Sequence, residues 1–175
     1  NYAVGNTVNP FGVPCMFSTL SEIEATGTNG ELMFIYYPYL TSDQSASADN
    51  SLYMAASADT ANMYSAYESY VAFPKLNTES VSKLQISMKL RATSRVDKLT
   101  VGVMTDPMKV ETFVAVEEIT LPRVNEWVDY YVTLDSYKGN GEYIALRMPK
   151  SSSPMSMFVD DVRIENIIEC NVPQN

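Results

Sequence analysis

Two pairs of adjacent acidic residues are the first place in this sequence where chemistry could be carried out. The pairs are Glu117 with Glu118 and Asp160 with Asp161. Glycoside hydrolysis needs two carboxyl groups that face one cleft, about 5–10 Å apart. Both pairs lie in segments typical of strands, where neighbouring side chains point to opposite faces, so neither pair supplies the two catalytic groups. Carboxylates from different strands could still converge on one cleft.

The absence of histidine narrows the chemistry further. The sequence contains no histidine, which removes the commonest general base, the imidazole of a serine or cysteine triad, and the commonest metal ligand. A G-x-S-x-G nucleophile motif is also absent. We therefore predict that the protein is not an enzyme.

Asp160 is the carboxylate whose placement matters most. In a regular strand it lies on the same face as Phe158, Val162 and Ile164, and Asp161 lies on the opposite face. A carboxylate on a dry face is costly unless it is paired with a cation or bound to a metal. Two interpretations are open at this point: a metal ligand, or an aspartate held by hydrogen bonds or by an arginine.

Aromatic side chains are the other candidate binding groups. Trp127 and Tyr131 are expected on the outer face of one strand, and Tyr64, Tyr67 and Tyr70 are expected near a loop. Exposed aromatic rings can stack on sugar rings or anchor a protein interface. These five are the predicted ligand-binding residues. The alternative is that most of them are packing residues, since tyrosine often buries its ring and leaves its hydroxyl in water.

Most of these residues fall in segments whose pattern predicts β-strands. Between residues 83 and 91, Leu84, Ile86, Met88 and Leu90 alternate with polar residues, which is the period of a strand with one dry and one wet face. Less regular segments of the same kind are predicted as strands at residues 33–39, 51–55, 69–73, 99–103, 112–119, 128–134, 142–148 and 157–168.

The number and spacing of these segments indicate the fold class. About nine or ten short strands without a long helix predict an all-β jelly-roll sandwich of two antiparallel sheets. Asn140 and Gly141 are typical of a tight hairpin turn between two of the strands. We assign residues 1–170 to a single jelly-roll domain and residues 171–175 to the start of a linker to a further domain.

Composition makes several partners and classes unsuitable. Hydrophobic residues make up 46% of the chain, which argues against disorder. Twelve basic residues against twenty-one acidic ones give a formal net charge of -9, so nucleic acid and anionic membranes are poor partners. No segment reaches the ~18 consecutive apolar residues of a transmembrane helix, so we expect no membrane insertion by this segment.

Cysteine usage bears on the compartment. The two cysteines are Cys15 and Cys170, which are too few for a structural zinc site in a chain without histidine. They are either two unpaired buried thiols or a disulfide that joins the first and last strands. A disulfide of that kind persists only in an oxidising compartment.

Several motifs in the second half of the chain resemble a known family. They are VGVMTDP at residues 101–107, YKGNGEYIALR at 137–147 and FVDDVRIE at 158–165. Their order and spacing over roughly residues 80–170 are similar to those of the cleaved-adhesin and choice-of-anchor J jelly-roll modules of Bacteroidota surface proteins, which are themselves MAM-like.

The resemblance carries two implications for individual residues. In related proteins a cysteine near the first strand and one after the last strand recur as Cys15 and Cys170 do here, which favours the disulfide. An acidic residue at the position of Asp160 helps to bind a structural calcium in related jelly rolls. Calcium takes six to eight oxygen ligands, and Glu22 and Glu24 are the candidate further ligands.

The function implied by the resemblance is binding without catalysis. We expect an extracellular adhesion or binding module of a multidomain bacterial surface protein, secreted or held at the cell surface in association with the outer membrane. Its expected partners are a glycan or a surface protein, together with neighbouring domains of the same chain. The alternatives are a structural spacer without a ligand and an accessory domain of a secreted hydrolase.

Overall fold

The computed structural model describes residues 7–8, 17–23, 39–42, 44–47, 51–56, 67–75, 80–93, 98–121, 123–150 and 155–167. Within these residues it contains eleven strands and two short 3-10 helices. Both cysteines and residues 171–175 lie outside the described residues, so the disulfide and the linker stay predictions.

The strands and 3-10 helices are β1 (Thr7–Val8), β2 (Phe17–Ile23), β3 (Tyr39–Thr41), β4 (Ser51–Ala56), β5 (Tyr67–Ala72), η1 (Val81–Lys83), β6 (Leu84–Ala92), β7 (Lys98–Met104), η2 (Val110–Thr112), β8 (Val114–Thr120), β9 (Val128–Thr133), β10 (Tyr143–Met148) and β11 (Met155–Asn166).

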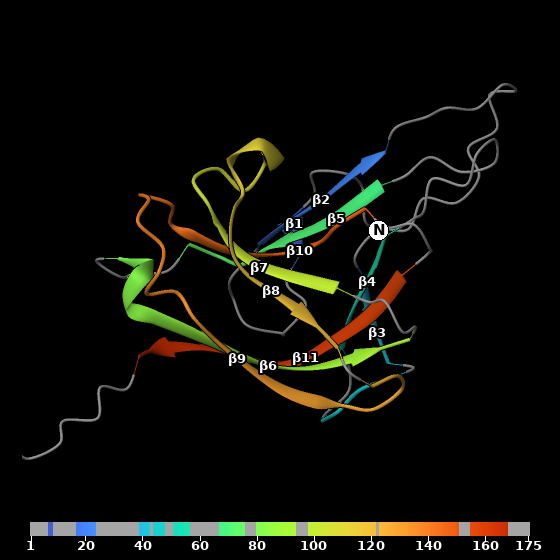
Figure 1. Cartoon of the computed structure of the whole chain (residues 1–175). Helices are drawn as coiled ribbons and strands as arrows, with labels where there is room; N and C mark the ends of the chain where they lie inside the picture. The colour runs from blue at the N-terminus through green and yellow to red at the C-terminus, as the bar shows by residue number, and fades with distance from the viewer. Residues whose placement is uncertain are drawn as a thin grey trace, which may run out of the picture.

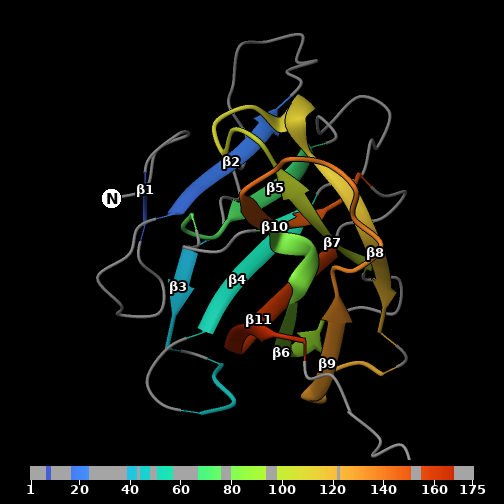
Figure 2. The ribbon, with the colours of Figure 1, turned by 90° about the vertical axis from the view of Figure 1, so that its left-hand side faces the viewer.

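The strands form the two layers of a jelly-roll sandwich, as predicted. One sheet has six strands in the order β1-β2-β5-β10-β7-β8, and the other has five in the order β3-β4-β11-β6-β9. All pairs of neighbouring strands are antiparallel. Figure 1 shows the six-stranded sheet above β6, β9 and β11, and Figure 2 lets the five-stranded sheet be followed from β3 across to β9.

Strand β6 confirms the clearest period-two segment of the sequence. Its buried side chains alternate with half-buried polar ones along all nine residues. Ile86, Met88 and Leu90 point into the space between the sheets, where each is at most 2% exposed. Full burial of a side chain of this size contributes about 1.5–3 kcal/mol, so one register of β6 is strongly favoured over a one-residue slip.

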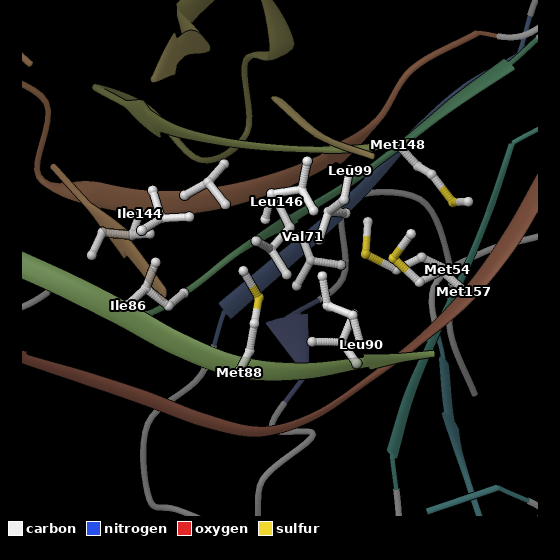
Figure 3. Packing of buried hydrophobic residues seen from close by; sticks show 14 of the residues in the cluster. Met54, Val71, Ile86, Met88, Leu90, Leu99, Ile144, Leu146, Met148 and Met157 are labelled. Carbon is white, nitrogen blue, oxygen red and sulfur yellow. The ribbon is translucent and has the colours of Figure 1, made fainter. Parts of the chain in front are cut away.

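The core lies between the two sheets and is supplied by both. Figure 3 shows Val71, Leu99 and Leu146 of the six-stranded sheet packed toward Met88 and Leu90 of the five-stranded sheet. Five methionines contribute to this core, and their flexible thioether side chains suit the irregular gaps between twisted sheets. They are Met54, Met88, Met148, Met155 and Met157.

Strand β11 changes phase in its middle. Met157 and Val159 are buried in the core, whereas further along Val162 and Ile164 pack against that same core. The register with β6 shifts between these two parts, and Asp161 there has a φ of 49°, a left-handed value uncommon outside glycine. Asp161 is thus the extra residue of a β-bulge.

The bulge corrects the expected face of Asp160. Regular alternation placed Asp160, Phe158, Val162 and Ile164 on one face, and this is wrong. Asp160 and Phe158 alternate with the buried Val159 and so lie on the outer side of the five-stranded sheet, while Val162 and Ile164 face the core. The prediction failed because it assumed an unbroken strand.

The segment between β9 and β10 corrects a second expectation. Asn140 and Gly141 do not form a tight hairpin, because β9 and β10 belong to different sheets. Gly141 instead lies where neighbouring side chains leave no room for a Cβ. Its N–H donates to the hydroxyl of Tyr137 at 2.8 Å, and an added Cβ would lie 2.6 Å from Val103. This glycine is needed for packing where the chain crosses between the sheets.

Candidate functional site

The outer face of the five-stranded sheet is the best candidate site in the described part of the chain. We define this face as the outward side chains of β6, β9 and β11. No other described strand lies beyond these three (Figure 1), and Asp129, Tyr131, Thr133 and Arg163 on this face are exposed. Its residues are Gln85, Ser87, Lys89, Arg91, Asp129, Tyr131, Thr133, Phe158, Asp160, Arg163 and Glu165.

One row of this face places an exposed aromatic ring near an arginine. Ser87 on β6 is directly opposite Arg163 on β11 and Tyr131 on β9. Adjacent strands are about 4.8 Å apart, so the backbones of Tyr131 and Arg163 are separated by about 10 Å. Tyr131 is 70% exposed, which confirms the predicted outward position of its ring.

An aromatic group lies at the end of the face where β11 pairs with β4. The rings of Phe158 and Tyr53 are 5.2 Å apart between centroids. The guanidinium of Arg91 lies 5.8 Å from the centre of the Phe158 ring, a cation–π arrangement. Trp127 is half-buried and immediately precedes β9, so it is less exposed than expected for a stacking platform.

Two of the carboxylates on or beside this face are held by neighbouring side chains. Asp161 accepts from the ammonium of Lys89 at 2.8 Å and from the hydroxyl of Ser47. The hydrogen bond from Lys89 lowers the pKa of Asp161, and that from Ser47 acts in the same direction. Glu165 accepts from the amide of Gln85 at 2.9 Å. The carboxylate of Asp161 therefore stays ionised at neutral pH, and both carboxylates are engaged within the protein.

Asp160 is held by backbone groups. It is 5% exposed, and one oxygen accepts from the N–H of Ala46 at 2.7 Å and of Ser47 at 3.2 Å. The other oxygen accepts from the N–H of Asp161 at 2.8 Å. Three such donors satisfy a buried carboxylate without a metal, which matches the hydrogen-bonded interpretation of this residue.

The predicted calcium ligands are not brought together in the described part of the chain. Glu22 lies on β2 of the six-stranded sheet, whereas Asp160 lies on β11 of the other. Glu24 falls outside the described residues. Among the residues that are described, no group of three or more acidic or cysteine side chains could hold a metal ion. Calcium binding stays a prediction.

The tyrosines expected near a loop divide into different cases. Tyr64 lies outside the described residues, and Tyr67 begins β5. Tyr70 is 5% exposed, so its expected exposure is wrong. It packs edge-on against Phe113, 5.5 Å between ring centroids, in a small cluster on the outer side of the six-stranded sheet. The segment with η2 covers that side, which the local sequence did not reveal.

Tyr70 belongs to a charged cluster that the sequence did not reveal. The carboxylate of Glu68 accepts from the guanidinium of Arg147 at 2.6 Å and from the hydroxyl of Tyr70 at 2.6 Å. Burial raises the pKa of Glu68, but the hydrogen bonds from Arg147 and Tyr70 outweigh burial, and the pKa lies below its ordinary value. Glu22 lies opposite Glu68 in the register of β2 and β5. The carboxylate of Glu68 is already bonded to Arg147 and Tyr70, so it is not available to bind a ligand together with Glu22.

The adjacent glutamates of β8 lie away from the candidate site. Glu117 and Glu118 are exposed on the edge strand of the six-stranded sheet. Glu118 pairs with Lys98 at 2.7 Å.

Among the described residues, no helix is both long and apolar enough to cross a membrane.

Solved structures with this fold include adhesin domains. The K1 cleaved adhesin domain of Lys-gingipain from Porphyromonas gingivalis W83 is similar with a TM-score of 0.55 and 15% identity, over 86% of this chain and 99% of that domain. The K2 cleaved adhesin domain of Lys-gingipain gives 0.51 and 13%, over 91% and 87%. The glycoside hydrolase domain of Endo-D from Streptococcus pneumoniae R6 gives 0.53 and 14%, over 87% of this chain and 22% of that one.

Sequence comparison adds no closer relative. No family model and no curated protein sequence matches the chain. At the identities of the solved structures, the likeness concerns the fold. The resemblance to cleaved-adhesin modules is thus confirmed as a resemblance of architecture.

Proposed function

We propose that this chain is a non-catalytic binding module of an extracellular surface protein and that it binds carbohydrate on the outer face of the five-stranded sheet. The observation that carries the proposal is the ring of Tyr131, 70% exposed in the middle of a strand. Around it lie polar side chains such as Ser87 and Thr133.

This arrangement suits a sugar better than it suits a peptide or a lipid. The apolar face of a sugar ring stacks on an aromatic side chain, while hydroxyl and amide groups beside it bond the sugar hydroxyls and fix its orientation. Ser87 and Thr133 place such hydroxyl groups beside Tyr131 on one side of the sheet. A spacer domain has no need of an exposed ring in an open polar face.

The extracellular setting and the adhesive role have separate support. The similar domains of Lys-gingipain are named as cleaved adhesin domains, and we extend that role to this chain. A disulfide between Cys15 and Cys170, as the sequence resemblance implies, would stabilise the domain in an oxidising compartment. Absence of catalysis is supported by the structural partners of Glu68, Asp160 and Asp161.

Replacement of Tyr131 tests the proposal. A glycan array probed with the labelled protein is expected to give hits with the wild-type chain. Tyr131→Ala removes the stacking surface and should weaken binding to those hits by about tenfold or more, whereas Tyr131→Phe keeps the ring and should retain them.

Val114→Ala is the matched control for this experiment. Val114 is also an exposed apolar residue, at 51%, but it lies on β8 of the other sheet. Its replacement should leave every hit unchanged. An array without hits, or hits that survive Tyr131→Ala, would contradict the proposed function.

A further inference from the structure

Three basic residues of the described part of the chain form no ion pair, and they are Arg91, Lys138 and Arg163. The sequence has twenty-one acidic residues for twelve basic ones, so carboxylates are in excess. Six described basic side chains form ion pairs: Lys75, Lys89, Lys98, Lys109, Arg123 and Arg147. Among the described residues, Arg91 and Arg163 have no carboxylate within ion-pair distance.

Both of these arginines lie on the outer face of the five-stranded sheet. Arg91 is on β6 and Arg163 is opposite Ser87 of the same strand, four residues away. At about 3.3 Å per residue, the two are separated by about 13 Å along the sheet. The Phe158 ring supports the guanidinium of Arg91, while Arg163 is exposed.

The acidic side chains of this face do not neutralise Arg163. Asp161 is bonded to Lys89 and Glu165 to Gln85. Asp129 lies opposite Lys89 of β6, whereas Arg163 lies opposite Ser87 of that strand. The free cationic groups are therefore arginines, which bind planar anions through two parallel hydrogen bonds.

We infer that the ligand of this face is an acidic glycan, in which a sugar ring stacks on Tyr131 and a carboxylate or sulfate reaches Arg163. This inference rests on the proposed function and names the class of sugar. The row of Tyr131, Ser87 and Arg163 spans about 10 Å, a span that lets the stacked ring and the anionic group belong to the same or to neighbouring sugars. Arg91 provides a second cationic position for a longer chain.

Four hexasaccharides test the inference by calorimetric titration. Hyaluronan hexasaccharide carries carboxylates, chondroitin 4-sulfate hexasaccharide carries carboxylates and sulfates, and cellohexaose and N-acetylchitohexaose are neutral. We expect at least one acidic hexasaccharide to bind ~10-fold more tightly than both neutral ones. Hyaluronan binding identifies the carboxylate as the recognised group, and binding of the chondroitin sulfate alone identifies the sulfate.

Arg163→Gln provides the second arm. It removes one exposed charge and should lower affinity for the acidic hexasaccharide by ~10-fold, with partial recovery in Arg163→Lys. The matched control is Lys98→Gln, because Lys98 is basic and exposed but lies on β7 of the other sheet, and it should leave affinity unchanged. Because exposed charges are screened, added salt should also weaken acidic binding.

Two outcomes overturn the inference and can be told apart from failure of the proposed function. If the neutral hexasaccharides bind as tightly as the acidic ones and Arg163→Gln has no effect, the face binds sugar without selecting charge. If neither acidic hexasaccharide binds, the acidic class is wrong, and the hits on the array and their loss in Tyr131→Ala decide separately whether the face binds glycan at all.

Discussion

Glu68 illustrates how a single carboxylate can be structural in a fold that binds ligand elsewhere. It is 8% exposed, and its carboxylate accepts charge-assisted hydrogen bonds from the guanidinium of Arg147 and the hydroxyl of Tyr70. The guanidinium of Arg147 also lies 5.9 Å from the rings of Tyr70 and Phe113. Removing the charge of Glu68 would leave a partly buried guanidinium without its counter-ion, which is more costly than losing an exposed pair.

We expect Glu68→Gln to destabilise the fold by about 1.5–3 kcal/mol, the range for hydrogen bonds to charged groups. Urea unfolding measures this value. Glu118→Gln is the matched control, because Glu118 makes an exposed pair with Lys98 that is worth less than ~1 kcal/mol. Equal losses in the two variants would contradict the structural role assigned to Glu68.

The same residue makes stability depend on pH. Because the folded-state pKa of Glu68 lies below its ordinary value of 4.5, its contribution is fully present above that value. The contribution is lost as the pH falls through the folded-state pKa, where both states become protonated. The stability difference between wild type and Glu68→Gln should therefore shrink as the pH falls below about 4.5, and a constant difference would contradict it.

Individual tyrosines show what the sequence could and could not predict at this scale. Tyr131 was expected to be exposed because it alternates with Tyr130 and Val132 on one strand, and that rule is local. Tyr70 also lies on a strand, but its exposure is decided by the segment around Phe113, which is distant in sequence and covers it. Local alternation assigns a face to a residue but does not tell whether that face is covered.

At the scale of elements, the bulge in β11 positions the candidate site. Because Asp161 is an extra residue, Val162 and Ile164 face the core and Arg163 faces outward beside Ser87. The bulge also brings Asp161 within reach of Lys89 and Ser47. Two adjacent aspartates in an otherwise apolar strand are a sequence signal for such a bulge. Their position in the sequence does not show which residue of the strand is the extra one.

Deletion of Asp161 is expected to leave a folded sandwich. The remaining strand would alternate regularly, with Val159, Val162 and Ile164 inward and Arg163 still opposite Ser87. The cost should be about 1–3 kcal/mol, because Asp160 loses one of its backbone donors. Thermal unfolding followed by circular dichroism measures it.

Deletion of Phe158 is the comparison for this experiment. Phe158 lies where β11 pairs regularly with β4 and β6, so its removal puts Met155 and Met157 out of phase with the core. We expect no cooperative unfolding transition in this variant. Similar behaviour of the two deletions would show that Asp161 is not the extra residue.

At the scale of the whole molecule, the sequence predicted the architecture but not the pairing of its strands. Alternation predicted the positions of β6, β7, β9 and β10 closely. The total number of predicted strands indicated a sandwich of two antiparallel sheets. The position of Asn140 and Gly141 was misjudged because a turn signal does not tell which sheet the next strand joins. Pairing depends on contacts between residues far apart in the chain, which periodicity does not encode.

The whole-molecule view also explains why the candidate site lies on one sheet. The outer side of the six-stranded sheet is partly covered by the cluster around Tyr70 and Phe113. The outer face of the five-stranded sheet keeps Tyr131 and Arg163 accessible. The two outer faces differ around these residues because the segment between β7 and β8 folds back on the six-stranded sheet.

The most direct measurement is amide chemical-shift mapping during titration with the oligosaccharide that binds most tightly. We expect the largest changes along β6, β9 and β11, centred on Ser87, Tyr131 and Arg163, with little change on β5 and β10. Changes centred on the six-stranded sheet, or confined to loops at an end of the sandwich, would contradict the claim that the outer face of the five-stranded sheet binds the ligand.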